Sequence, residues 1–268
     1  MHVGCAQWTH KAWEAAGPDK LRAYAERCNA VEGNTTFYAT PSRETVESWA
    51  RQTGEDFRFV LKLPKPVTHE HRLTGGDEDL RRFLHAIEPL GKRVHALWVQ
   101  LPGSFGPGDL EVLAAFLRRL PADYKYAVEV RDAAFFEDPR ALESVLRAAD
   151  AEWVPFDTTV MFAGPPTSDM ERDAWTKKPR MPLRTAAITA RPIVRYLGRD
   201  DTARTVEGWQ KWVQVVSGWL KEGRSPTVFV HTPDNVAAPA LARRFHEEVR
   251  ARTPGLAPLP EPVPTTLF

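Results

Sequence analysis

Short apolar runs rich in β-branched and aromatic residues recur along the chain, and helical patterns separate most of them. This alternation is typical of α/β proteins built on parallel strands. Nearly every run carries an ionisable or amide side chain at or near its end. The predicted strands cover residues 2–6, 31 onward, 57–62, 94–101, 125–131, 152–157, 192–198 and 226–231. Eight such strands predict a single (β/α)₈ TIM-type barrel.

The length and the helical patterns agree with one barrel. The chain has 268 residues, close to the roughly 250 of a typical TIM barrel. Apolar residues at helical spacing, several after a capping residue or near a proline, predict the helices. The predicted helices cover residues 18–28, 42–53, 109–120, 138–149, 202–222 and 237–252. Residues 1–252 are predicted to form the barrel, and residues 253–268 a proline-rich C-terminal tail that cannot be helical.

One connection breaks the rhythm of strand and helix. Residues 158–191, after the sixth predicted strand, are rich in proline and only weakly helical around 168–176. Loops of this length are usually functional. Because it follows a strand, the segment is predicted to lie over the C-terminal face of the barrel as a lid or a specificity loop. The alternative is a degenerate sixth crossover without a role in binding.

Composition narrows the class of protein. The chain carries 36 basic and 35 acidic residues, a formal net charge of +1. This balance argues against a nucleic-acid binder or a membrane-surface binder, either of which needs a basic excess on one face. Two cysteines, Cys5 and Cys28, do not indicate a disulfide scaffold. With no run of roughly 20 apolar residues and no signal-peptide pattern, we expect a cytoplasmic protein.

Polar side chains gather where the predicted strands end. In a barrel, the C-terminal ends of the strands form the floor of the active site. The sequence therefore predicts a site at that face. Its candidate residues are Glu32, Asn34, Tyr38, Lys62, His69, Gln100, Glu129, Arg131, Asp157, Arg195 and His231.

These residue types favour an enzyme that acts by acid–base chemistry on a small anionic or sugar-like substrate. Glu129 and Asp157 are the predicted acid and base. Arg131 and Arg195 offer planar forks that match carboxylate or phosphate oxygens. Lys62 can hold an anion or, if it is enclosed near another cation, act as a base or a Schiff-base nucleophile. The other candidates are predicted to bind and orient the substrate.

Two other classes of function use the same residues. Glu32, Glu129, Asp157 and His231 could instead bind a divalent cation in a hydrolase or nuclease-like barrel. The third possibility is a binding or scaffold protein whose charges only balance one another. No cofactor is expected in the favoured interpretation. The spacing of His69 and His71 does not match a zinc motif on a helix.

Five ordered blocks of sequence resemble the domain-of-unknown-function 72 family, the YecE/YunF-like barrels. Residues 29–38 resemble its N-T-V-E-I-N-S-T-F-Y signature, and residues 57–73 its block around the third strand. Residues 99–105 resemble Q-L-P-P-S-F, 128–131 resemble V-E-F-R, and 194–198 resemble V-R-L-H-G. The resemblance spans nearly the whole chain. It implies a TIM-type barrel and no particular activity.

The chain departs from that family pattern at several positions. Residues 5–9 read C-A-Q-W-T where T-S-G-W-S is usual, and residues 132–135 read D-A-A-F where H-P-S-W is usual. Leu197 stands where the family commonly has histidine, and residues 230–232 read V-H-T in place of F-N-N.

The end of the tail suggests one partner. Leu267 and Phe268 resemble the terminal pair of peptides that bind the bacterial sliding clamp, although residues 264–266 lack the expected glutamine. The alternative is that the tail packs against the barrel.

Overall fold

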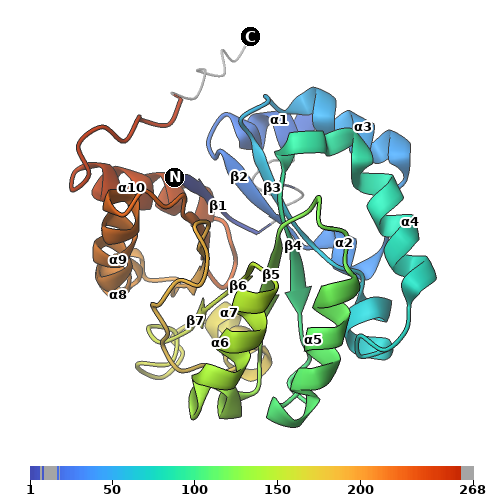
Figure 1. Cartoon of the computed structure of the whole chain (residues 1–268). Coiled ribbons are helices and arrows are strands. Elements are labelled where there is room, and N and C mark those ends of the chain that lie inside the picture. Colours follow the sequence, from blue (N-terminus) through green and yellow to red (C-terminus); the bar gives the residue numbers. More distant parts are fainter. Residues whose placement is uncertain (7, 9–16, 18, 261–268) are drawn as a thin grey trace.

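The strands among the described residues all run parallel and form two sheets (Figure 1). The computed structural model describes residues 1–6, 8, 17 and 19–260. The strands are β1 (His2–Gly4), β2 (Ala30–Gly33), β3 (Arg58–Lys62), β4 (Val94–Gln100), β5 (Tyr126–Glu129), β6 (Ala151–Trp153), β7 (Phe156–Asp157), β8 (Ile193–Leu197) and β9 (Thr227–His231). The predicted α/β class with parallel strands is confirmed.

The two sheets approach each other at one edge through β1 and β2. The first sheet has the order β2–β3–β4–β5–β6, and the second has the order β1–β9–β8–β7. An isolated parallel bridge joins Ala6, just after β1, to Glu32 in β2. The N–H of Glu32 donates to the carbonyl oxygen of Cys5 at 3.3 Å.

At the other edge the chain passes directly from one sheet to the other. The N–H of Val154 donates to the carbonyl oxygen of Val128 in β5 at 2.8 Å. One residue later, the carbonyl oxygen of Pro155 accepts a hydrogen bond from the N–H of Arg195 in β8 at 3.0 Å. Proline has no N–H to donate to a strand ladder. The predicted strand at 152–157 is therefore interrupted and divides into β6 and β7.

An apolar cluster fills the interior between the two sheets. It contains Ala30, Val60, Ala96, Trp98, Ala127, Val154, Ile193 and Phe229. These residues come from strands of both sheets and from the connection between them. The larger apolar cluster lies on the other face of the strands, against the helices. Both faces of the parallel strands are thus buried, as their continuous apolar sequences require.

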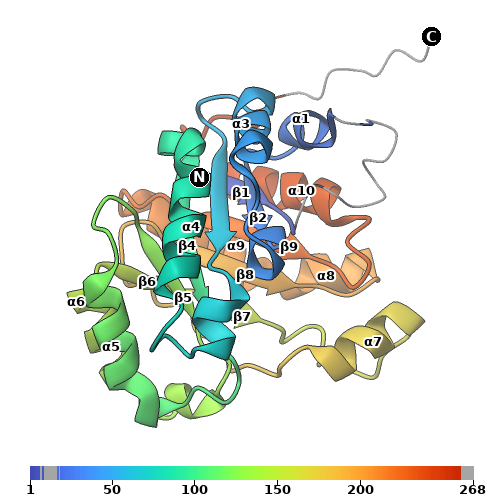
Figure 2. The ribbon, with the colours of Figure 1, turned by 90° about the vertical axis from the view of Figure 1, so that its right-hand side faces the viewer.

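The helices lie around the strands (Figure 1). They are α1 (Lys20–Ala25), α2 (Thr35–Tyr38), α3 (Arg43–Gln52), α4 (Asp77–Ile87), α5 (Leu110–Arg119), α6 (Pro139–Ala148), α7 (Asp169–Lys177), α8 (Thr202–Gly208), α9 (Gln210–Lys221) and α10 (Ala238–Arg250). Figure 2 shows α7 set apart from the other helices. No helix in the described part of the chain is long and apolar enough to span a membrane.

Three further elements differ from their prediction. The single helix expected at 202–222 divides at Trp209 into α8 and α9. Helix α4 was not predicted, although Leu80, Phe83 and Ile87 line its buried side at helical spacing. The segment that begins as β2 turns into α2 at Thr35, so the strand ends earlier than its apolar and aromatic residues suggest.

The described part of the tail packs against the body of the protein. Leu259 is buried in the outer apolar cluster and Leu256 packs beside it. The guanidinium of Arg243 donates to the carbonyl oxygen of Pro260 at 2.9 Å. Leu267 and Phe268, on which the sliding-clamp hypothesis rests, lie outside the described residues.

We expect Gly4→Ala to destabilise the protein, because Gly4 lets β1 approach β2. A Cβ atom at Gly4 would lie 2.0 Å from the carbonyl oxygen of Ala30 and 2.8 Å from the hydroxyl of Tyr24. Overpacking of a core typically costs about 1–3 kcal/mol, and here the obstacle is backbone. Urea denaturation should show at least this loss.

The matched control is Gly54→Ala. Nothing lies within 4 Å of a Cβ atom at Gly54, so this change should leave the free energy of unfolding unchanged within about 1 kcal/mol. Equal stability of the two variants would show that the approach of β1 to β2 does not require glycine.

Candidate functional site

A cluster of charged and amide side chains lies at the C-terminal ends of the strands, beyond the inner apolar cluster. Each member lies on a different strand, at its last residue or within two residues of it, and each is almost completely buried. We call this set the polar cluster; it comprises Glu32, Lys62, Gln100, Glu129, Arg195 and His231. Arg131, two residues beyond Glu129, joins its edge with a partly exposed side chain.

Glu32 lies at the centre of the polar cluster and has no solvent exposure. Its Oε1 atom lies 3.1 Å from Nζ of Lys62 and 3.3 Å from Nη2 of Arg195. Its Oε2 atom lies 2.7 Å from Nε2 of His231. Burial alone would raise the pKa of this carboxyl, but the charges of Arg195 and Lys62 and the hydrogen bond from His231 hold it well below its ordinary value. Glu32 is therefore ionised.

Glu129 is the second buried carboxylate. Nε of Arg131 donates to its Oε1 at 2.8 Å, and Nη1 of Arg195 donates to its Oε2 at 3.4 Å. Burial opposes ionisation, yet Arg131, Arg195 and Lys62 lower the pKa of Glu129 below its usual range. Arg195 thus contacts both carboxylates, and it also lies 4.2 Å from the ring of Phe156.

Lys62 is enclosed, with 3% of its surface exposed. Its Nζ donates to Oε1 of Gln100 at 2.8 Å and lies 5.0 Å from the ring of Trp98. Burial and then the charge of Arg195 lower the pKa of Lys62 to about 8, against the pull of Glu32. This side chain can therefore change its protonation state near neutral pH.

His231 is neutral and serves Glu32 as a donor. Burial is the main cause that lowers its pKa below the ordinary value, although Glu32 acts in the opposite direction. Because Glu32 is ionised and can only accept, Nε2 of His231 carries the proton of their 2.7 Å contact. Nε of Arg195 lies 3.5 Å from the same nitrogen. Because that nitrogen carries a proton, it is a poor acceptor for Arg195.

Asp157 does not join the polar cluster, which differs from its predicted role as the partner of Glu129. Its Oδ2 accepts from Nε1 of Trp212 in α9 at 2.7 Å, and its Oδ1 accepts from the N–H of Thr159. Successive residues of a strand point to opposite faces. Phe156 points inward to Arg195, so Asp157 points outward to the helices.

Three predicted binding residues lie near the rim. Asn34 is half-buried at the start of α2. Tyr38 is 78% exposed and packs edge-on against Phe37. His69 lies in a π-helical turn (Pro66–Glu70), where its ring contacts Phe37. Burial and then the charge of Arg131 lower the pKa of His69 to about 4.

Residues 158–191 contain two features that the sequence analysis missed. Lys178 follows α7 and is half-buried; burial and the charges of Arg195 and Arg131 lower its pKa. It therefore adds a fourth cation near the polar cluster. The only signal in the sequence was its place in a lysine pair within the predicted lid. The second feature is a buried ion pair.

Helix α7 is held in place by Arg199, just beyond β8. Nε and Nη2 of Arg199 bind the two carboxylate oxygens of Glu171 at 3.1 and 2.6 Å. Both side chains are buried, Arg199 with 1% exposure. Arg199 also donates to the carbonyl oxygens of Gly164 and Pro165. We call this Arg199–Glu171 arrangement the latch.

Apolar contacts continue from the latch toward the strand ends. Phe156, Met161, Ala174 and Leu197 form a separate buried cluster between α7 and the ends of β7 and β8. Residues 158–191 thus cover part of the end of the sheet, as predicted.

The four predicted metal ligands do not form a common shell. Asp157 points away from Glu32, Glu129 and His231, and the two glutamates contact cations. Within the described residues, no group of three or more histidine, cysteine, aspartate or glutamate side chains is arranged to hold a metal ion.

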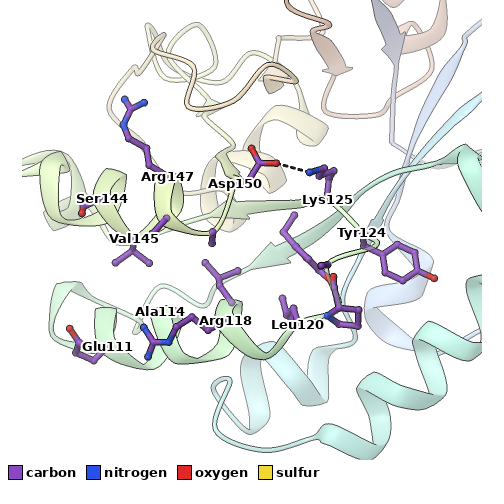
Figure 3. Close-up of a pocket in the computed structure, with 16 residues that line it drawn as sticks. Glu111, Ala114, Arg118, Leu120, Tyr124, Lys125, Ser144, Val145, Arg147 and Asp150 are labelled. Atoms are coloured by element: carbon purple, nitrogen blue, oxygen red, sulfur yellow. Dashed lines mark hydrogen bonds and ion pairs between the residues drawn. The ribbon is translucent and has the colours of Figure 1, made fainter.

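A cleft of about 720 Å³ lies elsewhere, between α5 and α6 (Figure 3). It is lined by residues along α5, by the C-terminal half of α6 and by the residues that precede β5 and β6, where Lys125 pairs with Asp150 at 2.6 Å. This is the amino end of the strands, whereas the polar cluster lies at their carboxyl ends. The cleft is therefore separate from the polar cluster.

Comparisons with known proteins give consistent results. A sequence model described as "Protein of unknown function DUF72" matches residues 2–266. The UPF0759 protein YecE of Escherichia coli (strain K12) is 36% identical over 272 residues, covering 100% of both chains. The UPF0759 protein YunF of Bacillus subtilis is 26% identical over 135 residues, covering 47% of each chain.

Solved structures show the same fold. A DUF72 family protein of Enterococcus faecalis superposes with a TM-score of 0.68 at 18% identity, covering 94% of each chain. A DUF72 family protein of Thermotoga maritima gives a TM-score of 0.67 at 22% identity, covering 93% of this chain and 98% of the other. None of these names states an activity.

We expect Arg199→Met to release α7 and to destabilise the protein. Removing one partner of a buried ion pair typically costs about 3–5 kcal/mol because the other charge stays buried. Limited proteolysis should then cut within residues 158–191 faster than in the unmodified protein. Arg172→Met, which removes an exposed pair with Asp169 on the same helix, should cost no more than about 1 kcal/mol.

The latch also predicts a dependence on pH. Arg199 and backbone donors lower the pKa of Glu171 from 4.5 to about 2, against the effect of burial. A lowered carboxyl pKa stabilises the fold above the unfolded value, and this contribution disappears as the pH falls toward the folded value. The stability difference between the unmodified protein and Arg199→Met should therefore shrink from pH 4.5 to about pH 2. A constant difference would contradict the ionised latch.

Proposed function

Because the chain belongs to the DUF72 family, whose name carries no activity, we propose a function from its polar cluster: an enzyme that binds a small anionic compound and transfers a proton with Lys62. One observation carries this proposal. Among the described residues, Lys62, Arg131 and Arg195 contact Glu32 and Glu129. Three cations against two carboxylates leave one positive charge, and the half-buried Lys178, whose pKa the charges of Arg195 and Arg131 lower, would add a second.

The proposed frame is a closed eight-stranded barrel in which β6 and β7 are two halves of one strand. The bridge between Ala6 and Glu32 at one edge supports closure. The direct passage through Pro155 at the other edge supports it as well. The interior apolar cluster, shared by both sheets, would be the core of that barrel. The polar cluster would then lie at the face where TIM-barrel enzymes bind their substrates.

An anionic substrate fits the excess positive charge. Buried charges are normally paired, because unpaired ones are costly to remove from water. Arg195 reaches Glu32 and Glu129 only at 3.3 and 3.4 Å, longer than the usual 2.7–2.9 Å of a charged hydrogen bond. A phosphate or carboxylate beside Arg131 and Arg195 would neutralise the remaining positive charge. Its oxygens could lie closer to the two guanidinium groups than the oxygens of Glu32 and Glu129 lie to Arg195. Gln100 and Asn34 would contribute amide contacts to the rest of a sugar-like molecule.

Lys62 is the proposed proton carrier. Glu32 and Glu129 have lowered pKa values and stay ionised at neutral pH, so neither can donate a proton. A pKa of about 8 lets Lys62 exchange its proton in the physiological range. Glu129, assigned to acid or base chemistry from the sequence, instead orients Arg131 and Arg195.

Two alternatives make different predictions. A metal-dependent hydrolase would bind a stoichiometric divalent cation that is lost when Glu129 is replaced by glutamine. A non-catalytic binding protein would have the same anion site but no catalysed reaction. Lys62→Met would then remove no activity. The excess of positive charge favours an anion over a metal cation at this site.

We expect inorganic phosphate to raise the melting temperature of the protein and Arg195→Met to abolish this rise. At a phosphate concentration about 100 times its dissociation constant, binding to the folded state contributes about 2.7 kcal/mol. This corresponds to a shift of several degrees for a chain of this size. The measurement is a thermal melt at constant ionic strength, with potassium chloride as the reference salt.

Arg184→Met is the matched control. Arg184 is also nearly buried, lies 4.5 Å from the ring of Trp153, and pairs with Glu143 of α6 outside the polar cluster. Its loss should lower stability but leave the phosphate shift intact. Arg131→Met serves as a second test if Arg195→Met does not fold. An undiminished phosphate shift in both cluster variants would reject the anion site.

A further inference from the structure

We infer that Lys62 forms a covalent imine with its substrate, and that this substrate is a small aldehyde or ketone carrying a phosphate or carboxylate group. The inference rests on the proposed function, because the anionic group is what the surrounding cations bind. It adds a chemical class for the reacting atom and a covalent intermediate.

The contacts of Lys62 suit a nucleophilic amine. One hydrogen bond and one ion pair hold its nitrogen: it donates to Oε1 of Gln100 at 2.8 Å and lies 3.1 Å from Oε1 of Glu32, a carboxylate oxygen without a hydrogen-bond donor among the described residues. A neutral amine can keep the hydrogen bond to Gln100 through one N–H bond and still present its lone pair for attack. The side chain is therefore fixed before a substrate arrives, which lowers the entropy cost of attack.

The neighbouring charges favour the reactive form of the amine. Nη2 of Arg195 contacts the same oxygen of Glu32 as Nζ of Lys62 does. A second cation at this place, together with burial, is the arrangement that makes a lysine nucleophilic at neutral pH. With a pKa of about 8, roughly a tenth of Lys62 is neutral at pH 7.

The same surroundings stabilise the product of the attack. A protonated imine carries the positive charge of the ammonium group that it replaces. Glu32 and the face of Trp98, 5.0 Å from Nζ, are already placed to stabilise that charge. The cation balance of the polar cluster thus stays unchanged during the step.

The step balances without another reactant. The nitrogen of Lys62 attacks the carbonyl carbon, a C–N bond forms, and the carbonyl oxygen takes up protons from the amine and leaves as water. Counted from protonated Lys62, one carbonyl compound enters, one water leaves, and the net charge is constant. No oxidant or reductant is consumed. The proton transfer proposed for Lys62 is then the transfer of its own protons to the departing carbonyl oxygen, and the resulting imine withdraws electrons from the adjacent bonds.

Reductive trapping tests this inference. The full-length protein is incubated with pyruvate or glycolaldehyde phosphate, reduced with sodium borohydride, and analysed by intact mass and by peptide mapping. We expect one adduct on Lys62, absent from Lys62→Met and retained in Lys65→Arg, whose exposed lysine lies three residues away. Acetone, which has the carbonyl without the anionic group, should give roughly ten-fold less adduct.

Two further measurements keep the result interpretable. Inorganic phosphate should protect Lys62 from trapping, and Arg131→Met should reduce trapping roughly ten-fold while Lys62 is intact. Adducts spread over exposed lysines, or no adduct on Lys62 with either anionic probe, would overturn the imine. If phosphate still raises the melting temperature in that case, the anion site stands and only the covalent step is lost. If the phosphate shift is also absent, both proposals fail.

Discussion

The ionised carboxylate of Glu32 is the interaction on which the rest of the site depends. A carboxylate without solvent exposure is costly unless charged or hydrogen-bonding partners surround it. Its three partners, Lys62, Arg195 and His231, come from β3, β8 and β9. Two of these strands belong to one sheet, and the third belongs, with β2, to the other. Glu32 therefore ties the two sheets together at their carboxyl ends, as the inner apolar cluster does below it.

The stability of the fold does not explain this cluster. A buried ionic network is often no more stable than well-packed apolar side chains of the same volume. The inner cluster shows that the same strands can pack apolar residues: Ala30 lies two positions before Glu32, and Val60 two positions before Lys62. The change from apolar to charged along one face occurs at the same level on several strands. This change in character is what the proposed anion site requires, and packing alone does not require it.

Much of this arrangement could be read from the sequence because it follows from strand ends. Lys62, Glu129 and His231 are the last residues of β3, β5 and β9, and their convergence follows once the strands are parallel. The face of the sheet to which each side chain points was harder to predict. An error of one residue in the position of a strand turns every side chain to the opposite face. Asp157 and Arg195 both lie near strand ends, yet only Arg195 faces inward. The break at Pro155 concealed this difference by dividing the strand that carries Asp157.

Long-range partners were beyond the reach of sequence patterns. Arg199 meets Glu171 across 28 residues, and nothing local distinguishes this glutamate from the exposed acids of the same helix. Lys178 gains its role only from the position of the segment that carries it. Tyr38 was assigned to the site for its aromatic ring, but α2 turns that ring to the surface. Patterns along the chain predict periodicity, whereas these three outcomes depend on how distant segments pack.

The charges of the latch pair with each other and not with the charges of the polar cluster. Arg199 is paired with Glu171 and with backbone carbonyl oxygens, so it does not contribute to the positive excess near Lys62. Lys178 belongs to the same segment, residues 158–191, but the charges of Arg195 and Arg131 lower its pKa. The covering segment is thus held by one set of charges while it supplies another charge to the site. An anion that binds Lys178 would stabilise the covered state without altering the latch.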